Sequence, residues 1–261
     1  MKKQNDGLLT FGGHLEVFRQ MLFRILGVAA VIAIVVFCFK DITWQLLLAP
    51  SKWDFCTYRW IEGVMQAVGM DFRFEEFHVN MIATDLSSQF MTHITTAIYL
   101  GLLGASPYIL FELFRFISPA LYENERKYSV QVAGIIYVLF LFGVLMSYFV
   151  LFPISFRFLG TYAVADSVVS NITLDSYIST FVSLTLIMGV VFQLPVIAFF
   201  LGKMGIITSS TLAHYRKHLF LVIMLVAAII TPPDLMTLIL VTIPLYLLYE
   251  VSIRVIKWVG A

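Results

Sequence analysis

The composition of this 261-residue chain excludes an ordinary soluble protein. Hydrophobic residues make up 60% of the chain and charged residues only 13%, with a mean hydropathy of +0.91. Soluble domains carry about 45–50% apolar and about 25% charged residues, because their large surface needs polar cover. The formal net charge of +1 offers no strong field for nucleic acid. We therefore expect one compact domain over residues 1–261, embedded in a lipid bilayer.

Six apolar segments follow one another along the chain and predict membrane helices. A helix needs about 20 residues to cross a hydrocarbon core of about 30 Å. The predicted fold is an all-α polytopic membrane protein with six transmembrane helices, the last two short. Prolines at positions 107, 153, 195 and 244 predict kinked and tilted helices. The apolar segments cover residues 21–39, 89–116, 130–152, 177–201, 219–230 and 235–253.

The distribution of positive charge predicts the orientation in the membrane. With the N-terminus in the cytoplasm, 12 of the 17 Lys and Arg residues lie on the cytoplasmic side, as the positive-inside rule requires. Both termini are then cytoplasmic. The long segment 40–88, which carries seven Asp and Glu residues, becomes an outer loop. The expected cytoplasmic segments are 1–20, 117–129 and 202–218.

Motifs for enzyme chemistry do not occur in this sequence. It contains no Gly-x-Ser-x-Gly elbow, no His-Glu-x-x-His pair and no glycine-rich phosphate loop. His214 and His218 stand four residues apart but have no third ligand nearby in sequence, so a basic strip facing lipid headgroups is the favoured interpretation. Two cysteines, Cys38 and Cys56, are too few for a disulfide framework. We expect no enzymatic activity, no metal and no cofactor.

The most informative segment lies between the second and third apolar segments. It reads Phe-Ile-Ser-Pro-Ala-Leu-Tyr-Glu-Asn-Glu-Arg-Lys from Phe116 to Lys127. Pro119 can begin a turn or helix, Tyr122 gives the segment an apolar side, and Glu125 places a carboxylate at the membrane surface. Composition alone favours an ordinary solvated loop here.

Several motifs, spread over nearly the whole chain, resemble those of the TatC family in order and spacing. The second span is preceded by Met-Ile-Ala-Thr-Asp and followed by Ser-Pro-Ala-Leu-Tyr, and the later spans carry Phe-Gln-Leu-Pro, Thr-Pro-Pro-Asp and Ile-Pro-Leu-Tyr. These motifs occupy residues 81–85, 118–122, 192–195, 231–234 and 243–246. Because they are independent of one another, the resemblance is more specific than any single motif.

The resemblance implies a receptor in the bacterial cytoplasmic (inner) membrane. Proteins of this family bind the twin-arginine signal peptides of folded precursor proteins at the cytoplasmic face. They assemble with single-span partners of the TatA and TatB type, associate with themselves, and use the proton-motive force for export. The signal-binding residues implied for this chain are Glu125, Arg126, Arg19, Glu16, Phe116, Pro119 and Tyr122.

Two departures from the family pattern affect the implied sites. The family's N-terminal pattern is His-Leu-x-Glu-Leu-Arg, whereas this chain has Val17 at the glutamate position and Glu16 one residue earlier. One residue corresponds to about 100° of rotation on a helix. The second departure is Gln193, where many members carry glutamate. Gln193 and Pro195 are expected either to dock a partner helix or to make an internal hydrogen bond between helices.

A small-solute secondary transporter is the alternative function. Such transporters usually show pseudo-repeats and charged residues near the membrane midplane. Here the ionisable pair Glu112 and Arg115 lies near the inner end of the second span, three residues apart, and is expected to pair or snorkel. An intramembrane hydrolase would need a nucleophile and base, which we do not find in the sequence. The receptor is therefore the favoured function.

Overall fold

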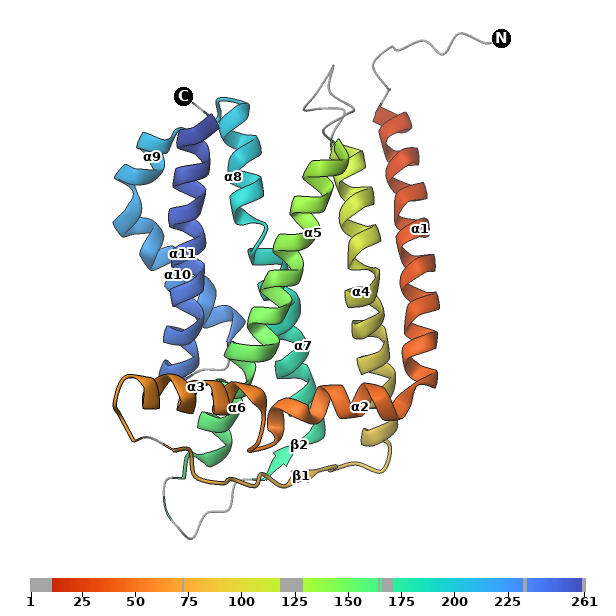
Figure 1. Cartoon of the computed structure of the whole chain (residues 1–261). Coiled ribbons are helices and arrows are strands. Elements are labelled where there is room, and N and C mark those ends of the chain that lie inside the picture. Colours follow the sequence, from red (N-terminus) through yellow and green to blue (C-terminus); the bar gives the residue numbers. More distant parts are fainter. Residues whose placement is uncertain are drawn as a thin grey trace.

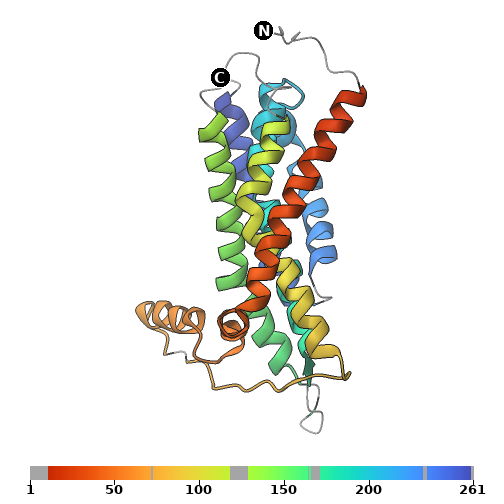
Figure 2. The ribbon, with the colours of Figure 1, turned by 90° about the vertical axis from the view of Figure 1, so that its right-hand side faces the viewer.

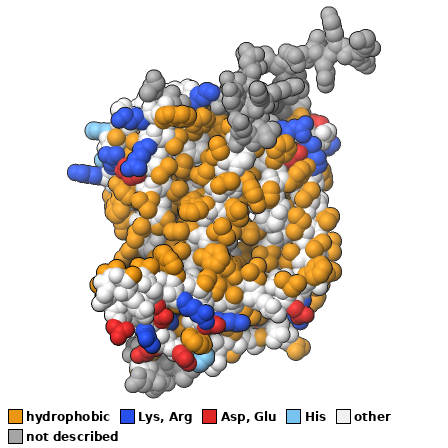
Figure 3. All heavy atoms as spheres, viewed as in Figure 1, with side chains coloured by type: hydrophobic (Ala, Val, Ile, Leu, Met, Phe, Trp, Pro, Cys, Tyr) orange, Lys and Arg blue, Asp and Glu red, His pale blue; other side chains and the backbone are white. Residues whose placement is uncertain are grey.

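A computed structural model describes residues 11–71, 73–117, 129–163, 165, 171–231 and 234–259. The described chain is mainly helical, and its long helices run side by side (Figures 1 and 2). Hydrophobic side chains form a broad belt across the middle of the molecule, and charged side chains gather at its two ends (Figure 3). This distribution matches the apolar core and polar interfaces of a bilayer, and the predicted all-α polytopic class is confirmed.

Five stretches in the described part of the chain are long and apolar enough to cross a membrane. Two of them consist of consecutive elements, because a π-helical turn joins α5 to α6 and a short break separates α7 from α8. The spanning elements are α1 (Phe11–Cys38), α4 (Ser88–Ile117), α5 (Ser129–Met146) with η3 (Ser147–Leu151) and α6 (Phe152–Thr161), α7 (Leu174–Val191) with α8 (Leu194–Lys203), and α11 (Leu235–Val259).

The sixth apolar helix, α10 (Arg216–Ile230), has 15 residues and is about 22 Å long. The prediction that both of the last helices are short holds only for α10, because α11 has 25 residues. The apolar segment in the sequence ends at about Ile253, directly before Arg254. The helix continues through Arg254 and Lys257, whose side chains are exposed and can reach the headgroup region.

The elements outside the spans gather at the two ends of the bundle (Figure 1). One end holds the start of α1, the end of α4, the start of α5, and α9 (Ser209–His214). The opposite end is covered by the rest, which run across it: α2 (Lys40–Leu48), η1 (Ala49–Ser51), α3 (Cys56–Ala67), and the parallel strands β1 (Met81–Ile82) and β2 (Ile172–Thr173). We call these two ends the α9 end and the α2 end.

Glycine allows two pairs of helices to approach closely. A methyl group built on Gly101 of α4 would lie only 2.6 Å from the Cβ of Ala33 in α1. A methyl on Gly189 of α7 would lie 2.6 Å from the ring of Phe140 in α5. Because lipid supplies no hydrophobic force between helices, such close van der Waals contact is a main source of their association.

Two prolines leave backbone carbonyls without their usual helical N–H donor. Hydroxyl groups from other elements donate to these carbonyls instead. Pro50 has no N–H, so it cannot donate to the carbonyl of Leu46 four residues earlier. The Tyr148 hydroxyl donates to that carbonyl instead, at 2.8 Å. The next carbonyl, that of Leu47 near the end of α2, accepts from the buried Tyr177 hydroxyl at 2.7 Å. These two bonds fasten α2 to the spans η3 and α7.

The same exchange fastens α3. Pro153 leaves the carbonyl of Phe149 open beside the π-helical turn, and the Thr57 hydroxyl donates to it. The neighbouring Tyr58 donates to the Pro153 carbonyl at 2.8 Å. Burial raises the pKa of Tyr58 well above its ordinary value, so the hydroxyl keeps its proton. The guanidinium of Arg157 lies over the Tyr58 ring, 5.4 Å from its centroid.

Removal of the Tyr177 hydroxyl should loosen α2 without changing the core volume. Tyr177→Phe leaves the Leu47 carbonyl without its donor, so we expect the free energy of unfolding to fall by about 1–3 kcal/mol. The measurement is thermal unfolding of the purified chain in detergent. Tyr162→Phe is the control, because Tyr162 is 63% exposed. Equal melting temperatures for the two variants would contradict the role assigned to Tyr177.

Candidate functional site

The first turns of α1 and the last turns of α4 meet at the α9 end of the bundle (Figure 1). The rings of Phe18 and Phe116 lie there with centroids 5.8 Å apart. Phe116, a residue implicated by the sequence, therefore lies beside the helix that carries Glu16 and Arg19. This pair of helix ends is the candidate site.

Glu16 and Arg19 are bound to each other. Their charged groups approach to 2.9 Å, and the Gln20 amide donates to the same Glu16 oxygen at 3.0 Å. Both charged side chains are largely exposed, with 47% of Glu16 and 66% of Arg19 accessible. An exposed pair of this kind contributes only about 0–1 kcal/mol, so incoming charges can exchange with it at little cost.

Helix geometry separates Glu16 from the interior of the site. The α4-facing side of α1 includes the buried residue Ile25, 7% exposed. Glu16 precedes Ile25 by nine residues, which corresponds to about 180° of rotation. Val17 precedes Arg24 by seven residues and lies within about 20° of it. Glu16 thus projects away from α4, and Val17 lies on the side of Arg24.

A buried carboxylate lies between the two helices. Glu112 of α4 is only 4% exposed and accepts a hydrogen bond from the Tyr108 hydroxyl at 3.1 Å. Arg24 of α1 approaches its other oxygen at 3.7 Å, and Arg115 approaches at 4.0 Å. The expected pairing of Glu112 with Arg115 is confirmed. The contact with Arg24 was not predicted, although an arginine inside the first apolar segment was a signal for it.

Four of the implicated residues lie outside the described residues. They are Pro119, Tyr122, Glu125 and Arg126. Of the remaining implicated residues, Glu16 and Arg19 pair with each other on α1, and Phe116 of α4 contacts α1 through Phe18.

Gln193 and Pro195 lie in another part of the molecule, at the break between α7 and α8. The Gln193 amide nitrogen donates to the carbonyl of Ile136 in α5 at 3.2 Å and approaches that of Gly189 at 3.4 Å. The internal hydrogen bond between helices is therefore present. Gln193 Oε1 is buried without a hydrogen-bond partner in the described part of the chain. One acceptor thus remains at this break.

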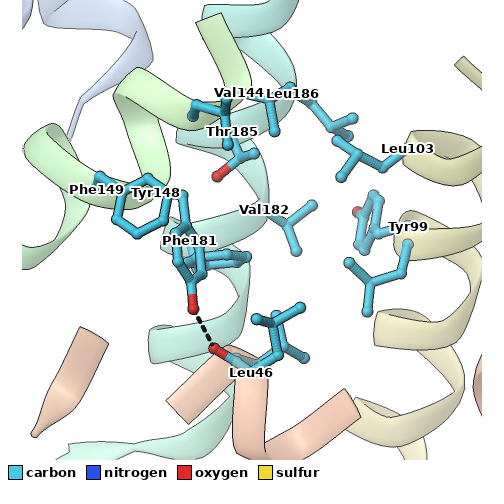
Figure 4. A pocket seen from close by; sticks show the side chains of 13 residues that line it. Leu46, Tyr99, Leu103, Val144, Tyr148, Phe149, Phe181, Val182, Thr185 and Leu186 are labelled. Carbon is cyan, nitrogen blue, oxygen red and sulfur yellow. Dashed lines mark hydrogen bonds between the residues drawn. The ribbon is translucent and has the colours of Figure 1, made fainter. Parts of the chain in front are cut away.

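An apolar cavity of about 240 Å³ opens between α2, α4, α5 and α7 (Figure 4). The Tyr148 hydroxyl at its edge is already bonded to Leu46, and the Thr185 hydroxyl is 3.2 Å from that of Ser147. The lining is otherwise apolar apart from the hydroxyl of Tyr99, so the cavity suits an apolar group. It is lined by Leu46, Leu47, Tyr99, Leu100, Leu103, Val144, Leu145, Tyr148, Phe149, Phe181, Val182, Thr185 and Leu186.

The α9 end also carries a second ion pair. Arg216 meets the carboxylate of Glu250 with two contacts, 2.9 and 3.0 Å, in a bidentate arrangement. Tyr246 approaches the same carboxylate at 3.3 Å. Glu250 is therefore fully engaged, in contrast to Glu112. His214 and His218 both lie against the Tyr215 ring, and the described residues contain no group of three or more His, Cys, Asp or Glu that could hold a metal ion.

Comparison with known proteins identifies the family to which this chain belongs. A sequence model of the Sec-independent protein translocase protein (TatC) matches residues 13–244. The chain belongs to the TatC family. It is 31% identical over 262 residues to a TatC of Blattabacterium, covering 99% of this chain and 98% of that protein. A TatC of Helicobacter pylori is 35% identical over 247 residues, covering 95% and 87%.

A solved structure of the family has the same fold. The crystal structure of the twin-arginine translocase receptor TatC superposes with a TM-score of 0.75 at 28% identity, covering 95% of this chain and 100% of that one. The chain is thus a multi-pass inner-membrane protein and a component of the Sec-independent protein translocase. The resemblance seen in the sequence motifs is confirmed over most of the chain.

Proposed function

We propose that this chain is the receptor that binds twin-arginine signal peptides of folded precursors at the α9 end. The observation that carries the proposal is the contact of Phe18 with Phe116, which places the first turns of α1, with Glu16 and Arg19, beside the end of α4, in a chain that matches the TatC family over residues 13–244. Its role is binding and transport, without a chemical step of its own. Glu125, Arg126, Pro119 and Tyr122 complete the proposed site from the sequence.

Guanidinium chemistry explains why arginine is selected. A guanidinium can bind a carboxylate through two parallel hydrogen bonds, which the ammonium of lysine cannot reproduce. At a membrane surface a single exposed pair is worth only about 0–1 kcal/mol, so two arginines and several contacts must act together. Phe18 and Phe116 offer apolar contact for the hydrophobic part of a signal peptide.

Glu125→Gln tests the recognition site. The substitution keeps the shape and removes the charge, so we expect the affinity for a synthetic twin-arginine signal peptide to fall about tenfold or more. The measurement is peptide binding to the full chain in nanodiscs, with a twin-lysine peptide in parallel and thermal unfolding as the check on folding. Wild-type affinity in the folded Glu125→Gln variant would show that the site lies elsewhere.

The α9 end is proposed to face the cytoplasm. The positive charge predicted for that side includes Arg216 and Lys217 at the start of α10 and Arg254 and Lys257 in the last turns of α11. Both helix ends lie at the α9 end of the bundle (Figure 1). Segment 40–88, at the α2 end, then faces outward, and both termini are cytoplasmic.

Cysteine labelling in intact cells tests this orientation. The native Cys38 and Cys56 are free and exposed, so both are first replaced by alanine. In that background, Asp71→Cys should react with an impermeant maleimide from outside, whereas Ser210→Cys should react only after the membrane is opened. The reverse pattern would invert the proposed topology.

Gln193 is the proposed docking point for a single-span partner helix of the TatA or TatB type. Its nitrogen is already bonded to Ile136, so the buried Oε1 is the atom that remains for a partner. An oxygen acceptor requires a donor, so the matching partner residue carries an N–H or O–H. Pro195 has no N–H and cannot donate to the carbonyl of Val191, so the helix is interrupted at this point.

Gln193→Leu separates docking from internal packing. We expect signal-peptide affinity to stay at the wild-type value while crosslinking to the partner helix and export both fall severalfold. Thr185→Val on the neighbouring helix α7 is the matched control, because its hydroxyl is bonded internally to Ser147. Unchanged crosslinking and export in Gln193→Leu would mean that the glutamine serves only the contact between α5 and α8.

A further inference from the structure

The arginine site needs a second carboxylate, and Glu16 is poorly placed to be it. Two signal arginines require two acceptors to be read separately from lysines. Glu16 projects from the side of α1 opposite Ile25, about 180° away on the helix. The residue on the correct side of α1 is Val17, which has no charge. The missing carboxylate must therefore come from another element.

We propose that Glu112 is the second carboxylate of the twin-arginine site, which binds one signal arginine after Arg24 gives way. This inference rests on the proposed receptor function and adds a residue to its site. Glu112 lies on α4 facing α1, on the side where Arg24 and Val17 stand. It precedes Ile117 by five residues and therefore lies about 7.5 Å below the end of the helix, within reach of an arginine side chain entering from the α9 end.

The contacts of Glu112 leave room for a ligand. A carboxylate offers about four acceptor positions, and charge-assisted N–H···O bonds are about 2.7–2.9 Å long. Tyr108 is the one hydrogen-bond donor at Glu112 within the described residues, at 3.1 Å. The guanidinium groups of Arg24 and Arg115 stay at 3.7 and 4.0 Å, so both are ion pairs without close hydrogen bonds.

The two resident arginines can be displaced. Their side chains are 47% and 66% exposed, so each can turn toward water and headgroups when a new guanidinium arrives. Glu112 itself cannot leave, because it is buried between α1 and α4. Glu250 shows the opposite case at the same end of the molecule, with both oxygens held by Arg216 at 2.9–3.0 Å.

Opposite effects of two substitutions distinguish a binding role from a structural one. If Glu112 binds the signal, Arg24 competes with the signal for it. Glu112→Gln should then weaken binding of a synthetic twin-arginine peptide about tenfold, whereas Arg24→Gln should tighten it roughly threefold. If the pair only holds α1 against α4, either substitution breaks it and both weaken binding alike.

The experiment uses the full chain in nanodiscs and measures Kd for twin-arginine and twin-lysine peptides. Glu250→Gln is the matched control, because it removes an ion-paired carboxylate from the same end and should leave the preference for arginine unchanged. Glu112→Gln should reduce that preference. Should Glu112→Gln fail to fold, Arg24→Gln decides alone: tighter binding supports the proposal, and unchanged or weaker binding overturns it.

The outcomes also separate this inference from the receptor function. If the wild-type chain shows no preference for arginine over lysine, the receptor function itself fails. If the preference is present and depends on Glu125 but is the same in Glu112→Gln as in the wild type, Glu112 is not part of the site and the receptor function stands.

Discussion

A proline leaves a helix carbonyl without its usual N–H donor, and the packing of the outer elements on the spans depends on how such carbonyls are bonded instead. Proline opens such carbonyls at Leu46 and Phe149. Each is closed by a hydroxyl from a different element, Tyr148 in one case and Thr57 in the other. Both hydrogen bonds join residues far apart in the sequence. The prolines that interrupt the helices therefore also create the bonds that hold α2 and α3 against the spans.

The charged residues at the α9 end form two kinds of ion pair. Around α9 to α11, Glu250 is fully paired with Arg216, and this ion pair ties two helices together. Around α1 and α4, the buried Glu112 has only long ion pairs, with Arg24 at 3.7 Å and Arg115 at 4.0 Å. The same residue types thus stabilise the fold on one side and remain available for a cationic ligand on the other. What differs is the geometry of the pair, bidentate and close in one case and long in the other.

Sequence reasoning reached the fold class, the positions of the apolar helices and the family, because continuous apolar segments and local motifs carry that information. It placed Glu16 by spacing alone and could not see which side of α1 faces α4. It paired Glu112 with Arg115, three residues away on the same helix, but missed Arg24, since a contact between helices depends on their packing. The end of α11 was also placed too early. The apolar segment ends at about Ile253, whereas the helix continues past the exposed Lys257 to Val259.

The close contact between Gly101 and Ala33 has a mechanical consequence. Because there is no room for a methyl group between them, α1 and α4 cannot slide or part at this point without losing that contact, so the contact resists their relative movement. Only Phe39 separates α1 from α2 in the sequence. A displacement of α1 would therefore act directly on α2. The hydroxyls of Tyr148 and Tyr177, which donate to carbonyls at the end of α2, are the hydrogen bonds that would oppose such a displacement.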